Sequence, residues 1–188
     1  MEWCLKHSKI VKLILTAAGL WLGSCQNSRY ITPPTQSINA KLNSVAAEGD
    51  VNFSYNGRYL VYTSDRASKR SVYLYDLQRQ RIISLPGVNQ PGSMQSQGDI
   101  SADGRYLVYL SEQLGKTDIY LYDRATAKSQ NITRNFIGEV RRPSISGNGR
   151  FIAFEGNRGG QWDIEIYDRG TTIDLSAPQN SNISPSTP

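Results

Sequence analysis

Three arginines recur at nearly equal steps along this chain, and their spacing suits binding chemistry. Arg58, Arg105 and Arg150 each follow a glycine in the same local phrase, 47 and 45 residues apart. If the phrase marks a repeated unit, the three guanidinium groups form a row on one rim. Such a row could hold an acidic peptide or a polymer carboxylate, because a guanidinium binds carboxylates in a bidentate way. The alternative is that each arginine pairs with an aspartate of its own repeat.

Catalytic chemistry has little support in the sequence. The only histidine, His7, lies in a segment that we expect to be removed, so neither a Ser-His-Asp arrangement nor a His-based metal site can be built. The aspartates that could form a carboxylate pair recur with the repeat, which favours turn roles for Asp99, Asp103, Asp118 and Asp123. No Gly-x-Ser-x-Gly elbow, phosphate loop or calcium-loop motif is present. We therefore expect no enzyme activity, no metal and no cofactor.

A repeated unit must position the arginines, since they belong to a phrase that the chain writes three times. The phrase reads SYNGRYLVY from Ser54, SADGRYLVY from Ser101 and SGNGRFIAF from Ser146. A second phrase, SVYLYD, DIYLYD and DIEIYD, keeps the same step. That step is the length of a four-stranded propeller blade.

Local patterns predict the strands of each unit. Asn-Gly or Asp-Gly at the heart of the phrase predicts a two-residue hairpin with positive φ at both residues. The outgoing strand is apolar on both faces, which stacked blades would cover. A weaker strand closes each unit, at 81–85, 129–133 and 172–175. The predicted fold is all-β, with three four-stranded antiparallel blades over residues 38–176, in which Ile38–Leu42 is an outer strand left over from a preceding blade.

The first 24 residues are predicted to be a lipoprotein signal peptide. A lysine-containing start precedes the apolar run 13–22, which is too short to span a bilayer. Leu22-Gly23-Ser24-Cys25 resembles the bacterial lipobox. This resemblance implies cleavage before Cys25 and attachment of lipid to that cysteine. The mature chain would then have no second cysteine for a disulfide.

The segments that flank the blades are polar. Residues 25–37 contain Pro33-Pro34 and are predicted to tether the blades to the membrane, and residues 177–188 form a C-terminal tail. In Gram-negative lipoproteins an Asp after the lipidated cysteine favours the inner membrane, so Gln26 favours a periplasm-facing outer-membrane location. The formal net charge of +5 is modest and partly belongs to the signal, so we expect no nucleic-acid partner.

The phrase Ser-x-Asp/Asn-Gly-Arg-Tyr, followed by DIYLYD, resembles the propeller repeat of the TolB family. The stretch GNRGGQWDI at 156–164 is especially similar, and the resemblance covers about residues 44–176. It implies a β-propeller with a protein-binding role. TolB is a soluble periplasmic protein with six blades and an extra domain, and it binds the peptidoglycan-associated lipoprotein. Three repeats and a lipid signal depart from that plan, so the TolB partner is not carried over.

Three blades fall short of the four to eight of closed propellers. The chain could form an open stack, or two half-rings could close as a homodimer. In the third repeat Glu155 replaces Thr63 or Leu110, and Glu165 replaces Tyr73 or Tyr120. Charge in a terminal repeat is typical of a cap whose outer face meets water, which favours the open stack.

The expected function is that of a lipid-anchored envelope protein whose blades are a scaffold for another envelope protein. One alternative is a stand-alone accessory propeller for an envelope hydrolase, since similar repeats occur in propellers attached to prolyl-oligopeptidase-like enzymes. Another is a structural lipoprotein that binds peptidoglycan through the arginine row.

Overall fold

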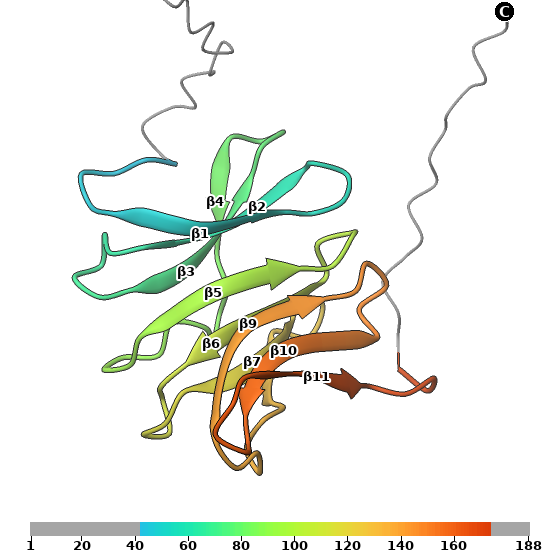
Figure 1. The fold of residues 1–188 in the computed structure, drawn as a ribbon. Coiled ribbons are helices and arrows are strands. Elements are labelled where there is room, and N and C mark those ends of the chain that lie inside the picture. The colour runs from blue at the N-terminus through green and yellow to red at the C-terminus, as the bar shows by residue number, and fades with distance from the viewer. Residues whose placement is uncertain (1–41, 174–188) are drawn as a thin grey trace, which may run out of the picture. The chain divides into compact units, whose positions relative to one another are not determined.

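The computed structural model describes residues 42–173 (Figure 1). The predicted signal peptide, the tether with the lipidation site Cys25, and the C-terminal tail lie outside the described residues. Residues 38–41 of the predicted leftover strand also lie outside them. Within residues 42–173 every regular element is a β-strand, which confirms the all-β prediction.

The strands form three antiparallel sheets, one for each repeat. The first contains β1 (Glu48–Phe53), β2 (Tyr59–Ser64), β3 (Ser71–Asp76) and β4 (Arg81–Ile83). The second contains β5 (Gln95–Ile100), β6 (Tyr106–Ser111), β7 (Asp118–Asp123) and β8 (Lys128–Asn131). The third contains β9 (Glu139–Ile145), β10 (Phe151–Asn157) and β11 (Asp163–Asp168). Strand order follows chain order in each, as in a propeller blade.

The third sheet has three strands among the described residues, where four were predicted. Residues 171–173, where that fourth strand was expected to start, form bends, and the rest of the predicted strand lies outside the described range. The three sheets do not close into a ring.

The hairpins that open the blades exist, but the predicted two-residue turn is wrong. Residues 54–58 join β1 to β2, and the Gly57 N–H donates to the Ser54 carbonyl at 2.9 Å. Gly57 has a φ of 66°, whereas Asn56 is not among the residues with positive φ. The Asn56 side chain instead accepts from the Ser54 hydroxyl at 2.8 Å and the Arg58 N–H at 3.0 Å. The asparagine stabilises the turn through its side chain, so it needs no left-handed backbone.

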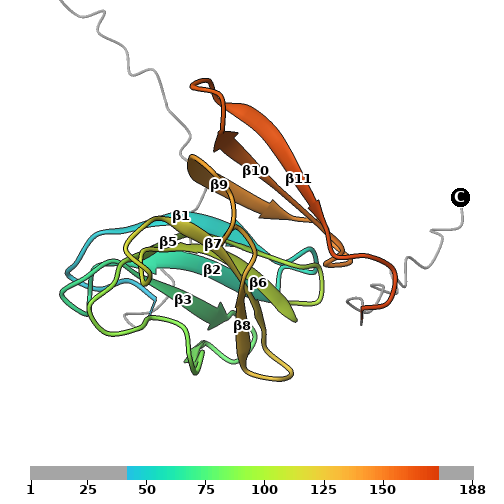
Figure 2. The same cartoon turned by 90° about the horizontal axis from the view of Figure 1, so that it is seen from below.

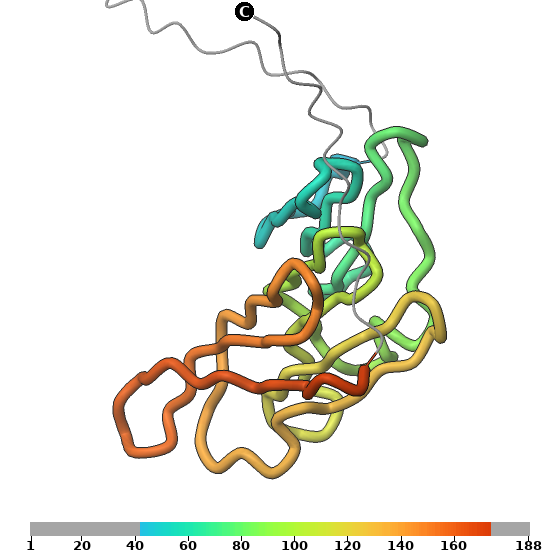
Figure 3. Tube along the Cα trace, turned by 90° about the vertical axis from the view of Figure 1, so that its right-hand side faces the viewer, coloured from blue at the N-terminus to red at the C-terminus, as the bar shows by residue number. Residues whose placement is uncertain are grey.

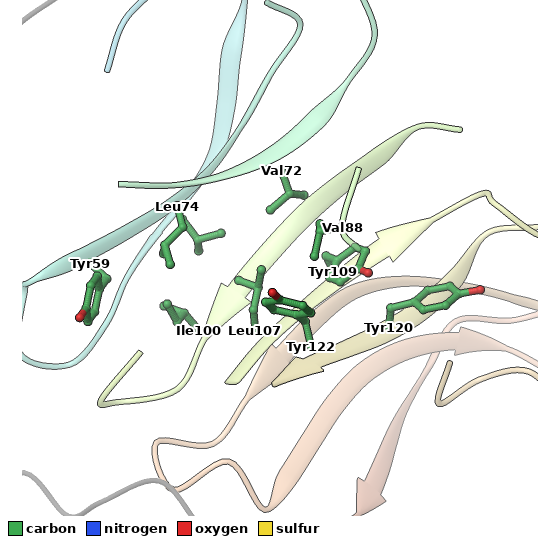
Figure 4. Packing of buried hydrophobic residues seen from close by; sticks show 10 residues of the cluster. Tyr59, Val72, Leu74, Val88, Ile100, Leu107, Tyr109, Tyr120 and Tyr122 are labelled. Carbon is green, nitrogen blue, oxygen red and sulfur yellow. The ribbon is translucent and has the colours of Figure 1, made fainter. Parts of the chain in front are cut away.

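Successive sheets pack face to face, and each has two distinct faces. We call the face that meets the next sheet along the chain the front and the opposite face the back. The front of the first sheet carries Tyr59, Val61, Val72 and Leu74. In one buried cluster they pack against residues of the second sheet, namely Ile100, Leu107, Tyr109, Tyr120 and Tyr122 (Figure 4).

The second joint repeats the first. Tyr106, Val108 and Leu121 on the front of the second sheet pack against Ile145 and Ile152 of the third. Leu110 and Ile119 pack against Val140 and Phe154 beside them. In the second sheet, apolar side chains on both strand faces are therefore buried by neighbouring blades, as the sequence predicted.

The first strand of each sheet lies beside its counterpart in the next blade. β1 contacts β5, and β5 contacts β9 (Figures 1 and 2). We call the first strand of each sheet the inner strand. A Cβ on Gly98 of β5 would lie 2.8 Å from a methyl of Val61, so the inner strand of the second sheet packs directly on the preceding sheet. Figure 3 follows the chain through the three sheets in turn. The inner strands therefore form a continuous row of three.

Candidate functional site

The three repeated arginines occupy one position in their blades, and each pairs with its own blade's aspartate. Arg58 lies 3.1 Å from Asp76, and Arg105 lies 3.1 Å from Asp123. The third pair, Arg150 with Asp168, is separated by 2.8 Å. These are the pairs that the sequence predicted as the alternative to a binding row.

Each pair links the residue before the second strand of its blade to the last residue of the third strand, and each arginine lies over a neighbouring ring. The guanidinium carbons of Arg58, Arg105 and Arg150 lie 4.7–4.9 Å from the centroids of the following aromatic rings. The hydrogen bond from Arg150 lowers the pKa of Asp168 to about 2. The arginines therefore have a structural role in every blade. That they also bind an acidic partner stays a prediction.

Two further arginines, which sequence reasoning missed, connect consecutive blades. The guanidinium carbon of Arg124 lies 4.6 Å from the ring centroid of Tyr59 in the preceding blade. Arg169 lies 4.1 Å from the Tyr106 ring in the same way. Both arginines directly follow the closing aspartate of the second phrase, and that position was the available signal.

Each inner strand contains a bulge at the same repeat position. The register shifts between Gly49 and Asn52 in β1 and at matching places in β5 and β9. A non-glycine residue has positive φ in each bulge: Asp50 at 48°, Gln97 at 49° and Arg142 at 51°. Such backbone is strained in a non-glycine residue and is often found at functional sites.

The bulges are hydrogen-bonded from blade to blade. The Gln97 N–H donates to an Asp50 carboxylate oxygen at 3.3 Å, and the Arg142 N–H donates to the Gln97 side-chain oxygen at 2.6 Å. The Ile145 N–H donates to Asp99 at 2.8 Å. These polar contacts fix the inner strands and border an open cleft of about 390 Å³ lined by Asp50, Val51, Asn52, Gln97, Arg142 and Pro143.

A second cleft joins the ends of the second and third blades. It has a volume of about 540 Å³ and is lined by Lys116, Thr117, Gly138, Glu139, Val140, Arg141 and Trp162. The guanidinium carbon of Arg141 lies 3.8 Å from the Trp162 ring centroid. Glu155 accepts from Arg141 at 2.6 Å and from Arg142 at 2.9 Å, and the two arginines lower the pKa of that carboxyl. We call this site the Trp162 cleft.

Both signs of charge line the Trp162 cleft, with Lys116 and Arg141 opposite in sign to Glu139. Arg141 and Arg142 share the single carboxylate of Glu155, and the Arg142 side chain is 68% exposed. The guanidinium beside the indole is that of Arg141, whose side chain is 39% exposed, and the two groups offer a cationic and an aromatic contact together. The sequence signal for this cleft was the Arg141-Arg142 pair together with the tryptophan of the third repeat.

The aspartates considered for catalysis do not converge on one site. Asp99 bonds to β9, Asp118 accepts from Thr133, and Asp123 pairs with Arg105. Asp103 accepts from Ser101 in its own turn. Residues 42–173 contain no group of three or more His, Cys, Asp or Glu side chains placed to hold a metal. Nor does this part of the chain include a helix with the length and apolarity to cross a bilayer.

Comparisons with known proteins identify the fold. No protein-family model matches the chain, and no curated protein matches it. TolB from Acinetobacter baumannii matches with a TM-score of 0.53 and 22% identity, over 69% of this chain and 32% of that one. Oligopeptidase B from Trypanosoma brucei matches with a TM-score of 0.51 and 14% identity, over 70% of this chain and 19% of that one.

The chain thus spans about a third or less of the length of these solved structures. Both likenesses fall below 25% identity and show the fold alone. Residues 42–173 therefore have the fold of consecutive TolB-like β-propeller blades.

Proposed function

We propose that this chain is a lipid-anchored envelope protein, without catalysis of its own, whose blades bind another envelope protein at the Trp162 cleft. The lipobox-like sequence before Cys25 supports the anchor, and Gln26 directly after it supports the outer-membrane location. The propeller scaffold supports binding, because clefts and loops on a rigid sheet are common contact sites.

One observation carries the binding proposal: Arg141 lies over the ring of Trp162, and both residues line the cleft. Tryptophan and arginine are enriched among the residues that dominate protein interfaces. Arg141 is already oriented by Glu155 at 2.6 Å, so little side-chain freedom is lost on binding. The exposed guanidinium of Arg142, the residue after Arg141 in β9, favours a partner segment with an acidic side chain.

In-cell photo-cross-linking tests this proposal with the full, lipidated chain. A photo-reactive residue at Glu139, which lines the cleft, should capture a partner. The same residue at Gln78, exposed in the turn after β3, is the matched control and should capture much less. Mass spectrometry of the adduct identifies the partner.

Variants make the test specific for the cleft. Arg141→Ala should reduce the Glu139 adduct by about tenfold, because about 1.4 kcal/mol corresponds to a factor of 10 in binding and interface hot spots exceed that value. Trp162→Phe keeps an aromatic ring under the arginine and should retain part of the adduct. Equal adducts from Glu139 and Gln78, or adducts that persist in Arg141→Ala, would refute binding at this cleft.

The anchor is tested separately. Cys25→Ser should move the protein out of the membrane fraction, because the acyl chains would no longer be attached. Protein that stays in the membrane fraction after this change would exclude the lipobox proposal.

A second candidate is an accessory propeller that works with a separate hydrolase. The likeness to oligopeptidase B, at a TM-score of 0.51, favours it at the level of fold. The same cross-linking experiment distinguishes the two candidate functions, because a hydrolase in the adduct would support the accessory propeller. Binding to peptidoglycan is the remaining outcome, in which the protein sediments with purified sacculi and charge reversal at Arg58, Arg105 and Arg150 abolishes it.

A further inference from the structure

The front face of the third sheet exposes isoleucine side chains beside Glu155, which is paired with Arg141 and Arg142. Ile164 is 71% exposed and Ile166 is 68% exposed. At the same repeat positions Val72 and Leu74 of the first sheet are fully buried. The second sheet buries its counterparts, Ile119 and Leu121, in the same way. The third sheet therefore presents the half of a blade joint that the first two sheets use.

At the opposite end of the stack the inner strand β1 is exposed, whereas Leu60, Tyr62 and Tyr75 on the back of the same sheet are already buried with Leu42. Val51 is 59% exposed and Phe53 is 61% exposed on β1. Their counterparts on β5 are Gly98, which presses on Val61, and Ile100, which is 5% exposed in the first joint. The inner strand of the first blade thus has the residues that a preceding front face would cover.

The repeated glycine provides an independent match between the two ends. A Cβ on Gly104 would lie 2.3 Å from the ring of Tyr59, and a Cβ on Gly149 would lie 2.6 Å from the ring of Tyr106. Each joint therefore seats an aromatic ring of one blade on a hairpin glycine of the next. At the free ends the same positions are Phe151, 41% exposed, and Gly57, whose Cβ would meet nothing within 4 Å.

Two residues that differ from the repeat at the ends of the stack are consistent with the same end-to-end pairing. Arg124 and Arg169 stack on Tyr59 and Tyr106 across the two internal joints. The first blade has Leu77 at the position of these arginines, and the third has phenylalanine in place of the tyrosine. An Arg–Tyr contact inside the chain thus corresponds to a Leu–Phe contact between its ends. The apolar pair suits a ring that lacks the hydroxyl.

Charge on the inner strands agrees with this arrangement. The bulge side chains of Asp50 and Gln97 each accept a backbone N–H from the next blade, whereas the Arg142 guanidinium can only donate and pairs with Glu155. By the repeat, Arg142 of the last blade would lie beside Asp50 of a following first blade. Opposite charges at this place favour contact, and like charges would oppose it.

From these matches we infer that two copies of the chain assemble head to tail, with the front of each third sheet on the inner strand of the partner's first sheet. Two such contacts would bring six described blades together, a number within the four to eight blades of closed propellers. This arrangement corresponds to the homodimer and not to the open stack.

Disulfide trapping tests the pairing in the full chain. In a background of Cys4→Ser and Cys25→Ser, Phe53→Cys and Ile166→Cys are combined, since their counterparts Ile100 and Leu74 share one buried cluster. Oxidation should give a covalent dimer only when both cysteines are introduced. A dimer from Ile166→Cys alone would show front-to-front pairing and overturn the head-to-tail arrangement.

Native mass spectrometry adds a readout that needs no introduced cysteine. The protein with an unmodified front face should have twice the mass of one chain. The double variant with Ile164→Asp and Ile166→Asp should have the mass of a single chain. Leu114→Asp, at a 60% exposed apolar residue of the β6–β7 loop, is the matched control and should leave the dimer mass unchanged. A single-chain mass without any substitution, or a dimer mass that survives both aspartates, would overturn the inference. Far-ultraviolet circular dichroism checks that the variants remain folded.

Discussion

Single residues in this chain act through contacts that the repeat multiplies. The closing aspartate of each second phrase accepts from a backbone N–H in its own turn: Arg79 to Asp76, Ala125 to Asp123 and Gly170 to Asp168, at 2.8–3.0 Å. The same carboxylates bind the repeated arginines. One residue type thus satisfies a turn and orients an arginine in each of the three blades.

Low pH should reduce the free energy of unfolding, because protonation of these aspartates weakens their pairs with the arginines. The pKa of Asp168 is lowered to about 2, against about 4 in an unfolded chain, chiefly by the bond from Arg150. Its contribution is complete above about pH 4 and is lost as the pH falls toward 2. We expect the urea midpoint to drop between pH 4 and 2.5, and to drop less in Asp168→Asn. Asp163→Asn, at the other end of β11, should keep the full drop.

Two tyrosines at equivalent positions should respond differently to loss of the hydroxyl. The Tyr109 hydroxyl lies 3.1 Å from the Ser129 hydroxyl, whereas the buried Tyr62 hydroxyl has no hydrogen-bond partner among the described residues. Tyr109→Phe should lower the free energy of unfolding by about 1 kcal/mol, and Tyr62→Phe should be neutral or stabilising. Urea unfolding measures both, and equal losses would contradict this account.

At the scale of elements, the hairpins set the joints between blades. The glycine of each repeated phrase has a positive φ, and in the second and third blades it also receives a tyrosine ring. Local turn geometry and packing between blades therefore depend on the same residue. A change at this glycine affects both.

Gly104→Ala tests that double role. Its φ of 78° costs an L-residue about 1–2 kcal/mol, and the added methyl would also meet the Tyr59 ring. Gly115→Ala is the control, because Gly115 has a φ of 82° and open space around its Cβ position. Chemical denaturation should show a larger loss for Gly104→Ala. Equal losses would mean that the joint tolerates the methyl.

The polar residues of the third blade show what a sequence comparison misses at this scale. Glu165 was expected on an outer, water-facing surface. In the structure it lines a cleft with Phe136 of the connection from the second blade, and it pairs with Arg158 at 3.4 Å. The expectation was wrong because strand alternation places Glu165 on the back face and Ile164 and Ile166 on the front. The charge of Glu165 predicted that it contacts water, but the strand register determined which face of the sheet it occupies.

For the whole molecule, the second sheet is the only one of the three covered on both faces by described sheets. Backbone amides exchange slowly where burial and packing oppose local opening. We expect the slowest hydrogen exchange in β6 and β7 and the fastest among the strands in β11. Peptide-resolved mass spectrometry measures this order, and greater protection in β11 than in β7 would contradict it.

The sequence by itself determined the blade. The repeat step predicted the number of sheets, and apolar residues on both faces of the central strands predicted stacking. These features are local or periodic, so they can be read from the residues in order. The aspartate partners of Arg58, Arg105 and Arg150 were also foreseen, as the alternative to a binding row.

Only the tertiary structure decided how the blades meet. The bulges at Asp50, Gln97 and Arg142, the stacking of Arg141 on Trp162 and the exposed faces at the two ends depend on contacts between residues far apart in the chain. No local pattern specifies such contacts, because strand register and sheet packing fix which face each side chain occupies. The sites proposed for a partner and for a second copy therefore became visible only when the sheets were placed together.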